Sequence, residues 1–381
     1  MVAAARRAPG LDLLRAAAIV WVMYYHALIM DLVPDRDPVA TYGWMGVDLF
    51  FALSGYLIGS QLFRPLTQGR QIGVARFYAR RALRTLPAYL VVVAIYFTVP
   101  AFSERPAIQP LWQFLTFTEN LFIDFQGGKA FSHVWSLCVE EQFYLVVPFA
   151  AWWLARRPRA WTAVALCVAI LLGGMALRGF VWLHDLAPIR SVTHGPGSFW
   201  QRYQERIYYP TWTRLDGLLG GVVLALIAAF RPVLWQALMR RADLIGAAAL
   251  ICLGVAIWIF HDQAGLLATV LGFPLLSLGM TGLVAWGAGP SGLLGRHPIP
   301  GAGAVAAMAY SLYLTHKQIY HMVHTTVGAG LDDRPILAFG VYSLAALAGG
   351  ALLYWTVERP FLRLREKLPR TSLRTSVLAE A

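Results

Sequence analysis

The chain has 381 residues, of which 58% are hydrophobic and only 14% are charged. Apolar runs long enough to span a bilayer recur from end to end, so this composition excludes two or three soluble domains and favours a polytopic helical membrane protein. The net charge of +12 does not indicate nucleic-acid binding, because the basic residues are distributed by topology. The three cysteines, Cys138, Cys167 and Cys252, lie in apolar runs at no metal-like spacing and suggest no disulfide framework.

Hydropathy predicts an all-α transmembrane bundle of about ten spanning helices. The predicted spans are residues 11–30, 43–63, 84–102, 133–154, 161–183, 213–230, 243–260, 266–287, 302–325 and 336–356. Residues 110–125 are too short and polar to cross, so we expect an interfacial or re-entrant segment there. Residues 1–361 are expected to form one membrane-embedded domain, and residues 362–381 a short basic cytoplasmic tail with no further domain appended.

Lys and Arg test this topology independently of hydropathy. Of the 32 basic residues, 21 fall in one set of alternating loops and termini, 7 in the opposite set and 4 inside the spans. The positive-inside rule therefore predicts a multi-pass protein of the cytoplasmic membrane with both termini in the cytoplasm.

The first predicted helix carries two ionisable residues, Arg15 and His26. Eleven residues separate them, which places both on one helical face, roughly 16 Å apart along the axis. A snorkelling arginine and an interfacial histidine would explain either residue alone. Two ionisable groups on one face instead favour a functional site, because such groups in a membrane usually face a protein interior or a wet cavity.

The third helix begins with an arginine cluster, Arg80, Arg81 and Arg84, in which the last two residues share a face. Guanidinium groups bind phosphate in a bidentate manner, so the cluster is a candidate site for a nucleotide-like donor. The alternative is ordinary anchoring to anionic lipid on the cytoplasmic side.

The fourth predicted span carries the adjacent pair Glu140 and Glu141, and His133, Glu140 and Tyr144 fall on one helical face. Two adjacent carboxylates cannot both face lipid, so at least one should meet a cation or share a proton. One interpretation of the glutamate pair is a structural ion pair with Arg214 or Lys317. The other is general-base chemistry, in which a histidine acts with a nearby carboxylate.

Two further regions carry unusual side chains. Residues 185–212 form the longest predicted external loop and contain many aromatic residues, which suit either a membrane-interface belt or a lid that stacks on a sugar. His316, His321 and His324 do not predict a metal site, because no acidic partner adjoins them.

Seven sequence blocks, in order, resemble the acyltransferase family 3 integral-membrane O-acyltransferases. They are LLRAAAIVWVMYYH, GVDLFFALSGYLIG, FYARRALRTLPAY, HVWSLCVEEQFYL, YYPTWTRLDGLLGGV, YSLYLTHK and VERPF. The blocks cover almost the whole chain, and HVWSLCVEEQFYL is the most diagnostic of them.

This resemblance implies an enzyme that moves an acyl group, commonly acetyl, from cytoplasmic acyl-CoA to a hydroxyl of a glycan, a lipid-linked sugar or a secondary metabolite. It implies no permanently bound cofactor and no metal. It also implies catalytic roles for His26 as general base, Arg15 as its partner and Glu140 or Glu141 as the group that orients it, with Arg80, Arg81 and Arg84 on the donor phosphates. The expected acceptor-facing residues are Asp48, Ser54, Tyr56, His133, Trp135, Tyr144, Arg214, Asp216 and His316.

Two alternatives stay open at this point. An acyl-enzyme on Ser54 or Tyr56 would split the transfer into two steps. A secondary transporter or flippase for a glycan or small metabolite would also have about ten helices and buried charges, although no internal repeat joins the two halves of the chain.

Overall fold

The computed structural model describes residues 8–33, 37–125, 129–156, 160–331 and 334–368, and that part of the chain contains helices and no strands. The ten long helices in the described residues are α1 (Pro9–Leu28), α3 (Gly46–Thr67), α4 (Val74–Thr98), α6 (Trp135–Arg156), α7 (Ala160–Val181), α9 (Asp216–Phe230), α11 (Ala242–Ile259), α12 (Phe273–Ala288), α14 (Ala302–Val327) and α15 (Pro335–Leu353). Shorter helices are α2 (Pro38–Thr41), α5 (Leu111–Leu115), α8 (Phe199–Tyr203), α10 (Pro232–Arg240), α13 (Leu293–Arg296) and α16 (Arg359–Lys367). Each predicted span coincides with one long helix, so the all-α prediction is confirmed.

Seven helical segments of the described chain are long and apolar enough to cross a membrane, or eight if the bent pair α9 and α10 is one span. Helices α6 and α14 are also long, at 22 and 26 residues, and each extends at least roughly 33 Å at 1.5 Å per residue. They are more polar because they carry Glu140, Glu141, His316 and Lys317. The protein is therefore a multi-pass membrane bundle, for which a count of ten spans is approximate.

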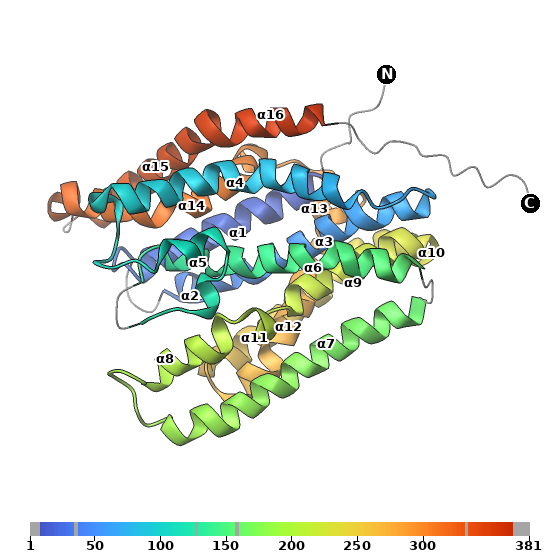
Figure 1. Ribbon diagram of the computed structural model, residues 1–381, viewed down its shortest axis with the longest axis horizontal. Helices are drawn as coiled ribbons and strands as arrows, with labels where there is room; N and C mark the ends of the chain where they lie inside the picture. The colour runs from blue at the N-terminus through green and yellow to red at the C-terminus, as the bar shows by residue number, and fades with distance from the viewer. Residues whose placement is uncertain (1–7, 34–36, 126–128, 157–159, 332–333, 369–381) are drawn as a thin grey trace, which may run out of the picture.

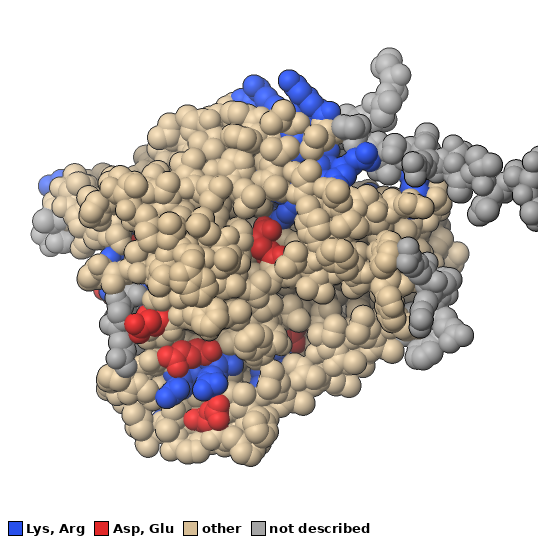
Figure 2. Space-filling model, in the orientation of Figure 1, with Lys and Arg blue, Asp and Glu red and all other residues tan. Residues whose placement is uncertain are grey.

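The helices run side by side along one long direction (Figure 1). Helix α3 packs against α9, α1 and α12, and α1 also packs against α14, so these five helices form the centre of the bundle. Helix α4 lies beside α16 at one edge, and α7 lies at the opposite edge (Figure 1). Much of the face in Figure 2 carries no charged side chain, as expected for a surface that contacts lipid.

Glycines allow the closest helix pair, α3 with α9, to approach. A Cβ added at Gly55 would lie 2.1 Å from the carbonyl oxygen of Leu218, and one at Gly221 would lie 2.2 Å from that of Ala52. Gly59 and Gly217 make similar contacts one turn away on each helix. Small residues spaced four apart are the usual way for helices to pack closely in a membrane.

Two predicted boundaries differ from the structure. Helix α4 begins at Val74, ten residues before the predicted span, so the arginine cluster lies within the helix rather than at its mouth. This first part is amphipathic, and its Arg80 and Arg81 find partners that a hydropathy window does not detect. The last helical stretch continues from α15 into α16 as far as Lys367, across the predicted tail boundary at residue 361, while residues 369–381 lie outside the described residues.

The segment predicted not to cross the membrane contains only α5 and a single 3-10 turn at Glu119–Leu121. Neither helix is long enough to span a bilayer, so this prediction is confirmed. The exposed side chains of Leu111, Trp112 and Leu115 give α5 an apolar surface.

Candidate active site

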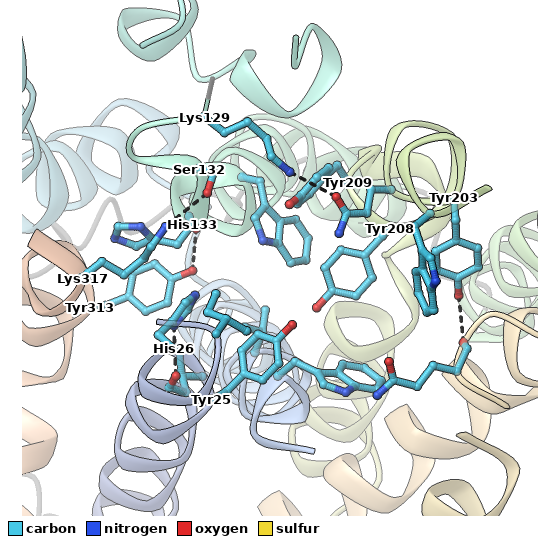
Figure 3. A pocket seen from close by; sticks show the side chains of 18 of the residues that line it. Tyr25, His26, Lys129, Ser132, His133, Tyr203, Tyr208, Tyr209, Tyr313 and Lys317 are labelled. Carbon is cyan, nitrogen blue, oxygen red and sulfur yellow. Dashed lines mark hydrogen bonds between the residues drawn. The ribbon is translucent and has the colours of Figure 1, made fainter. Parts of the chain in front are cut away.

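Three adjoining cavities in the described part of the bundle are lined by many, though not all, of the polar residues of the sequence analysis. The first, here called the histidine cavity, has a volume of about 290 Å³ and is lined by His26 and His133 (Figure 3). Its wall is rich in aromatic side chains, namely Tyr25, Trp44, Trp135, Trp200, Tyr203, Tyr208, Tyr209, Phe260, Phe273 and Tyr313. Four of these come from residues 185–212, so that segment borders the cavity as expected, while its movement as a lid stays a prediction.

His26 lies in the last turn of α1 and is 9% exposed. Its Nδ1 lies 3.0 Å from the Val22 carbonyl oxygen and 3.0 Å from Nε2 of His316. His316 in turn has its Nδ1 2.9 Å from the Leu312 carbonyl oxygen, which accepts a hydrogen bond from that nitrogen. In the neutral state Nε2 of His316 is therefore an acceptor, and His26 must donate from Nδ1.

This arrangement leaves Nε2 of His26 without a proton. Among the described residues it has no hydrogen-bond partner, and His26 lines the histidine cavity. A neutral imidazole with a free Nε2 beside a cavity meets the geometric requirement for a general base. His316, expected to face the acceptor, instead lies behind His26, where its Nε2 and the Val22 carbonyl oxygen both favour the Nδ1–H tautomer.

His133 is 2% exposed, and neither of its ring nitrogens has a partner among the described residues. Its ring centroid lies 5.8 Å from that of His26 and 5.2 Å from that of His316. The backbone carbonyl of His133 accepts a hydrogen bond of 2.6 Å from the Tyr313 hydroxyl. A buried ring with unused nitrogens at a cavity wall is available to hydrogen-bond a substrate.

Lys317 lines the same cavity and is held by two groups. Its Nζ donates to Ser132 Oγ at 3.3 Å and lies 3.1 Å from Glu104 Oε1. Glu104 also accepts bonds from the Tyr96 hydroxyl at 2.7 Å and from the Phe131 amide at 3.0 Å. Burial alone would raise the pKa of Glu104, but the Lys317 ammonium and these hydrogen bonds outweigh it and hold the pKa below its usual range. Lys317 is therefore held in place by Glu104 and Ser132, with one N–H still unused.

The backbone is strained beside this network. Phe131 has a left-handed conformation with φ of 61°, although it is a bulky residue and fully buried. Its ring packs against Tyr96, with centroids 4.5 Å apart, and against His133 at 5.1 Å. Such strain persists only where the surroundings fix it, and here it sets the position of Ser132 and His133 at the cavity wall.

The second cavity, here called the arginine cavity, has a volume of about 250 Å³. Five arginines line it: Arg15 from α1, Arg80, Arg81 and Arg84 from α4, and Arg365 from α16. The structure thus brings the predicted donor-binding arginines together with Arg15 and adds Arg365. The first turns of α1, the start of α4 and the end of α16 all meet at this end of the bundle.

The expected contact between His26 and Glu140 or Glu141 is wrong. Arg81 pairs with Glu141, its Nη2 lying 2.7 Å and its Nε 3.1 Å from Oε1, and Nη2 lies 3.7 Å from Oε2 of Glu140. Glu140 also accepts from Ser54 at 3.1 Å and from Tyr144 at 2.7 Å. The carboxylates lie on α6 one to two turns beyond His133, so they reach the arginines of α4 and not the end of α1.

The remaining arginines of this cavity are less fully paired. Arg15 makes one contact of 3.3 Å with Asp12 and none with His26. Arg80 donates to the backbone carbonyl of Arg365 at 3.0 Å. Arg84 has no hydrogen bond or ion pair with any residue that the structure describes. It is therefore the arginine whose charge is most available to an anionic ligand.

A third, smaller cavity of about 100 Å³, here called the middle cavity, lies between the other two. It shares Val47 and Tyr313 with the histidine cavity. It shares Arg15, Ser54, Leu57, Arg81 and Arg84 with the arginine cavity. The three cavities therefore adjoin one another through the bundle, from the arginines to His26.

Asp48, Arg214 and Asp216, expected to face the acceptor, do not line these cavities. Arg214 Nη2 lies 3.0 Å from both carboxylate oxygens of Asp48, and Asp216 pairs with Arg178 at 2.7 Å. All four side chains are buried, because these charges satisfy one another. The Arg214 guanidinium lies 4.5 Å from the ring centroids of Tyr208 and Phe273, so this pair supports the aromatic wall from behind.

The other expected acceptor-facing residues divide in the same way. Trp135 lines the histidine cavity, while Ser54 lines the middle and arginine cavities and Tyr144 the arginine cavity. Tyr56 is buried against Trp235, with ring centroids 6.2 Å apart, and lines none of the three. Neither candidate for an acyl-enzyme therefore lies at the histidine cavity.

Several lining residues carried no signal in the sequence as site residues. Lys129 and Arg105 belong to the seven basic residues of the predicted outer loops, and Glu104, which holds Lys317 without lining the cavity, stands out by no pattern. Tyr25 stands beside His26 in the sequence, but nothing marked it as a cavity residue. The positions of Glu104, Arg105 and Lys129 depend on how residues 104–125 and 129–134 fold back onto α14, which local sequence patterns do not report.

Comparison with known proteins gives a consistent result. A family model described as an acyltransferase domain matches residues 9–355. The O-acetyltransferase OatA of Staphylococcus aureus is 28% identical over 374 residues, covering 93% of this chain and 57% of the relative. The peptidoglycan O-acetyltransferase OatA of Listeria monocytogenes is 28% identical over 265 residues, covering 64% of this chain and 38% of the relative. The chain thus spans little more than half the length of the relatives it matches, and no solved structure matches it.

Proposed function

Because the chain belongs to the acyltransferase-domain family, we propose that it is a membrane O-acyltransferase. It moves an acyl group, with acetyl as the first candidate, from acyl-CoA to a hydroxyl of a glycan or other small acceptor. The O-acetyltransferase names of the relatives support acetyl, and the peptidoglycan named for one of them supports a glycan acceptor. The arginine cavity faces the cytoplasm in this proposal, in line with the distribution of basic residues.

The observation that carries the proposal is that the three cavities adjoin one another and share lining residues. The phosphates of CoA are anionic and suit the arginine cavity, above all Arg84 and Arg15. The long uncharged pantetheine arm passes through the middle cavity and brings the thioester to the boundary marked by Val47 and Tyr313. His26 is on the far side of this boundary, roughly 16 Å along α1 from Arg15. The donor therefore reaches the base without crossing the whole bundle.

At that boundary His26 acts as the general base. Its Nε2 takes the proton of the acceptor hydroxyl while the oxygen attacks the thioester carbonyl carbon. The C–O bond forms, the C–S bond breaks, and the imidazolium returns the proton to the leaving thiolate. The reaction consumes no net proton, and His316 accepts the Nδ1–H bond throughout.

The tetrahedral intermediate carries a negative charge on the former carbonyl oxygen, which needs hydrogen-bond donors. The free N–H of Lys317 and an N–H of the His133 ring are unused donors at the cavity wall. Tyr313 is less suited, because its hydroxyl already donates to the His133 carbonyl. Transfer in this scheme is direct, without an acyl-enzyme on Ser54 or Tyr56.

Release of free thiol from acetyl-CoA by the purified protein, with candidate acceptors, tests the proposal. His26→Ala should abolish acceptor-dependent release and still bind CoA, because the arginine cavity is intact. His184→Ala, at an exposed histidine that lines none of the cavities, should be fully active. Arg84→Gln should raise the KM for acetyl-CoA with little change in kcat. Normal release by His26→Ala would refute the assignment of the base.

A further inference from the structure

The charged side chains that line the histidine cavity are all basic. Three basic side chains line it, Arg105, Lys129 and Lys317, and its described lining residues include no Asp or Glu. In Figure 3 Lys317 and His133 lie at one side of the cavity, Tyr203 and Tyr208 lie at the other, and Lys129 extends toward Tyr209. A cavity built for an uncharged hydroxyl compound has no need of several cations.

Two of the three cations lack a compensating carboxylate. Lys317 is paired with Glu104 at 3.1 Å. Lys129 contacts the amide oxygen of Gln204 at 3.2 Å and lies 3.6 Å from the ring centroid of Phe125, but no carboxylate lies within 4.0 Å of it among the described residues. Arg105 is exposed at the cavity and its guanidinium has no partner in the described part of the chain.

The carboxylates near Lys129 do not balance its positive charge. Burial, with Lys317 and Arg105 nearby, lowers the pKa of Lys129 to about 8 in spite of Glu119 and Glu205. Glu119 is fully buried with no partner in the described residues, and burial raises its pKa to about 8, so it is mostly protonated at neutral pH. Glu205 is already bound by Gln201 at 2.8 Å.

We propose that the acceptor is an anionic hydroxyl compound, a sugar that carries a carboxylate or phosphate. The anionic group lies against Lys129 and Arg105, and the reacting hydroxyl faces Nε2 of His26. The sugar ring packs on the aromatic wall. This inference rests on the proposed function and narrows its acceptor to a charge class.

Direct binding tests this inference without depending on turnover. Calorimetry on the purified protein would compare D-glucuronate and D-glucose 6-phosphate with D-glucose at fixed ionic strength. Saturating CoA fills the arginine cavity, so that the probes cannot bind there. We expect at least one anion to bind about tenfold more tightly than glucose, a difference equivalent to about 1.4 kcal/mol. Which anion binds better distinguishes a carboxylate from a phosphate.

Matched variants locate the effect. Lys129→Gln and Arg105→Gln should each remove most of the preference for the anion, and Arg190→Gln, at a surface arginine that does not line the cavity, should keep it. Equal or undetectable binding of the anionic and neutral probes overturns the inference, as does a preference that survives Lys129→Gln. Anion binding without thiol release would instead refute the proposed function, while the inference that the cavity binds an anionic compound would still hold.

Discussion

The hydrogen bond between His26 and His316 gives the sharpest prediction about mechanism. In His316→Phe the ring keeps its approximate size, but Nδ1 of His26 loses the 3.0 Å bond to Nε2 of His316 and keeps only the Val22 carbonyl oxygen as an acceptor. That bond is most important when His26 is an imidazolium. A hydrogen bond to a charged group contributes about 1.5–3 kcal/mol, which corresponds to a loss of about 10- to 150-fold in kcat.

Initial rates of thiol release across a pH series would measure this effect. The acid limb of the rate profile reports protonation of the base, so His316→Phe should shift that limb as well as lower its plateau. His316→Gln, which offers a side-chain oxygen as acceptor, should recover part of the loss. Thermal unfolding in detergent controls for folding. A folded His316→Phe protein with kcat within twofold of the unmodified protein and an unshifted acid limb would refute the reasoning.

The remaining predictions concern stability. Gly221→Ala places a Cβ 2.2 Å from the Ala52 carbonyl oxygen and should destabilise the α3–α9 contact by roughly 1–3 kcal/mol. The control variant Gly254→Ala, whose Cβ meets no atom within 4 Å, should not lower the thermal midpoint. Equal thermal midpoints for the two variants would contradict the close packing of α3 on α9. Glu104 has a lowered pKa in the folded protein, so its contribution to stability is present above its ordinary value of 4.5 and is lost as the pH falls through the lowered value. Thermal midpoints of Glu104→Gln should therefore be lower at pH 7 and change less with pH below 4.5 than those of the unmodified protein. Parallel pH curves for the two proteins would count against the Lys317 pairing.

The helices were predictable because each spanning segment is an apolar run that its own residues define. The common face of Arg15 and His26 was predictable for the same reason, since helical periodicity fixes it locally. Both residues line interior cavities in the structure. Hydropathy did not predict the start of α4, because the helix extends beyond its apolar part into an amphipathic stretch in which Arg80 and Arg81 find partners.

The contacts between polar groups were not predictable. The partner of His26 is 290 residues away in the chain, and the partner of Arg81 is 60 residues away. Sequence showed that the two glutamates need a cation, yet the choice among Arg81, Arg214 and Lys317 depends on helix packing. The inclusion of Arg365 in the arginine cavity likewise depends on how α16 lies along α4.

In the proposed mechanism the donor and the acceptor enter the bundle from opposite ends and meet at His26. Sealed proteoliposomes with the protein in a single established orientation test this directly, with acetyl-CoA on the face of the arginine cavity and the acceptor only on the other face. The account predicts acetylated acceptor on its own side and free CoA on the donor side, with no acetyl-CoA crossing the bilayer. Product formed only when both reagents share one face would contradict it.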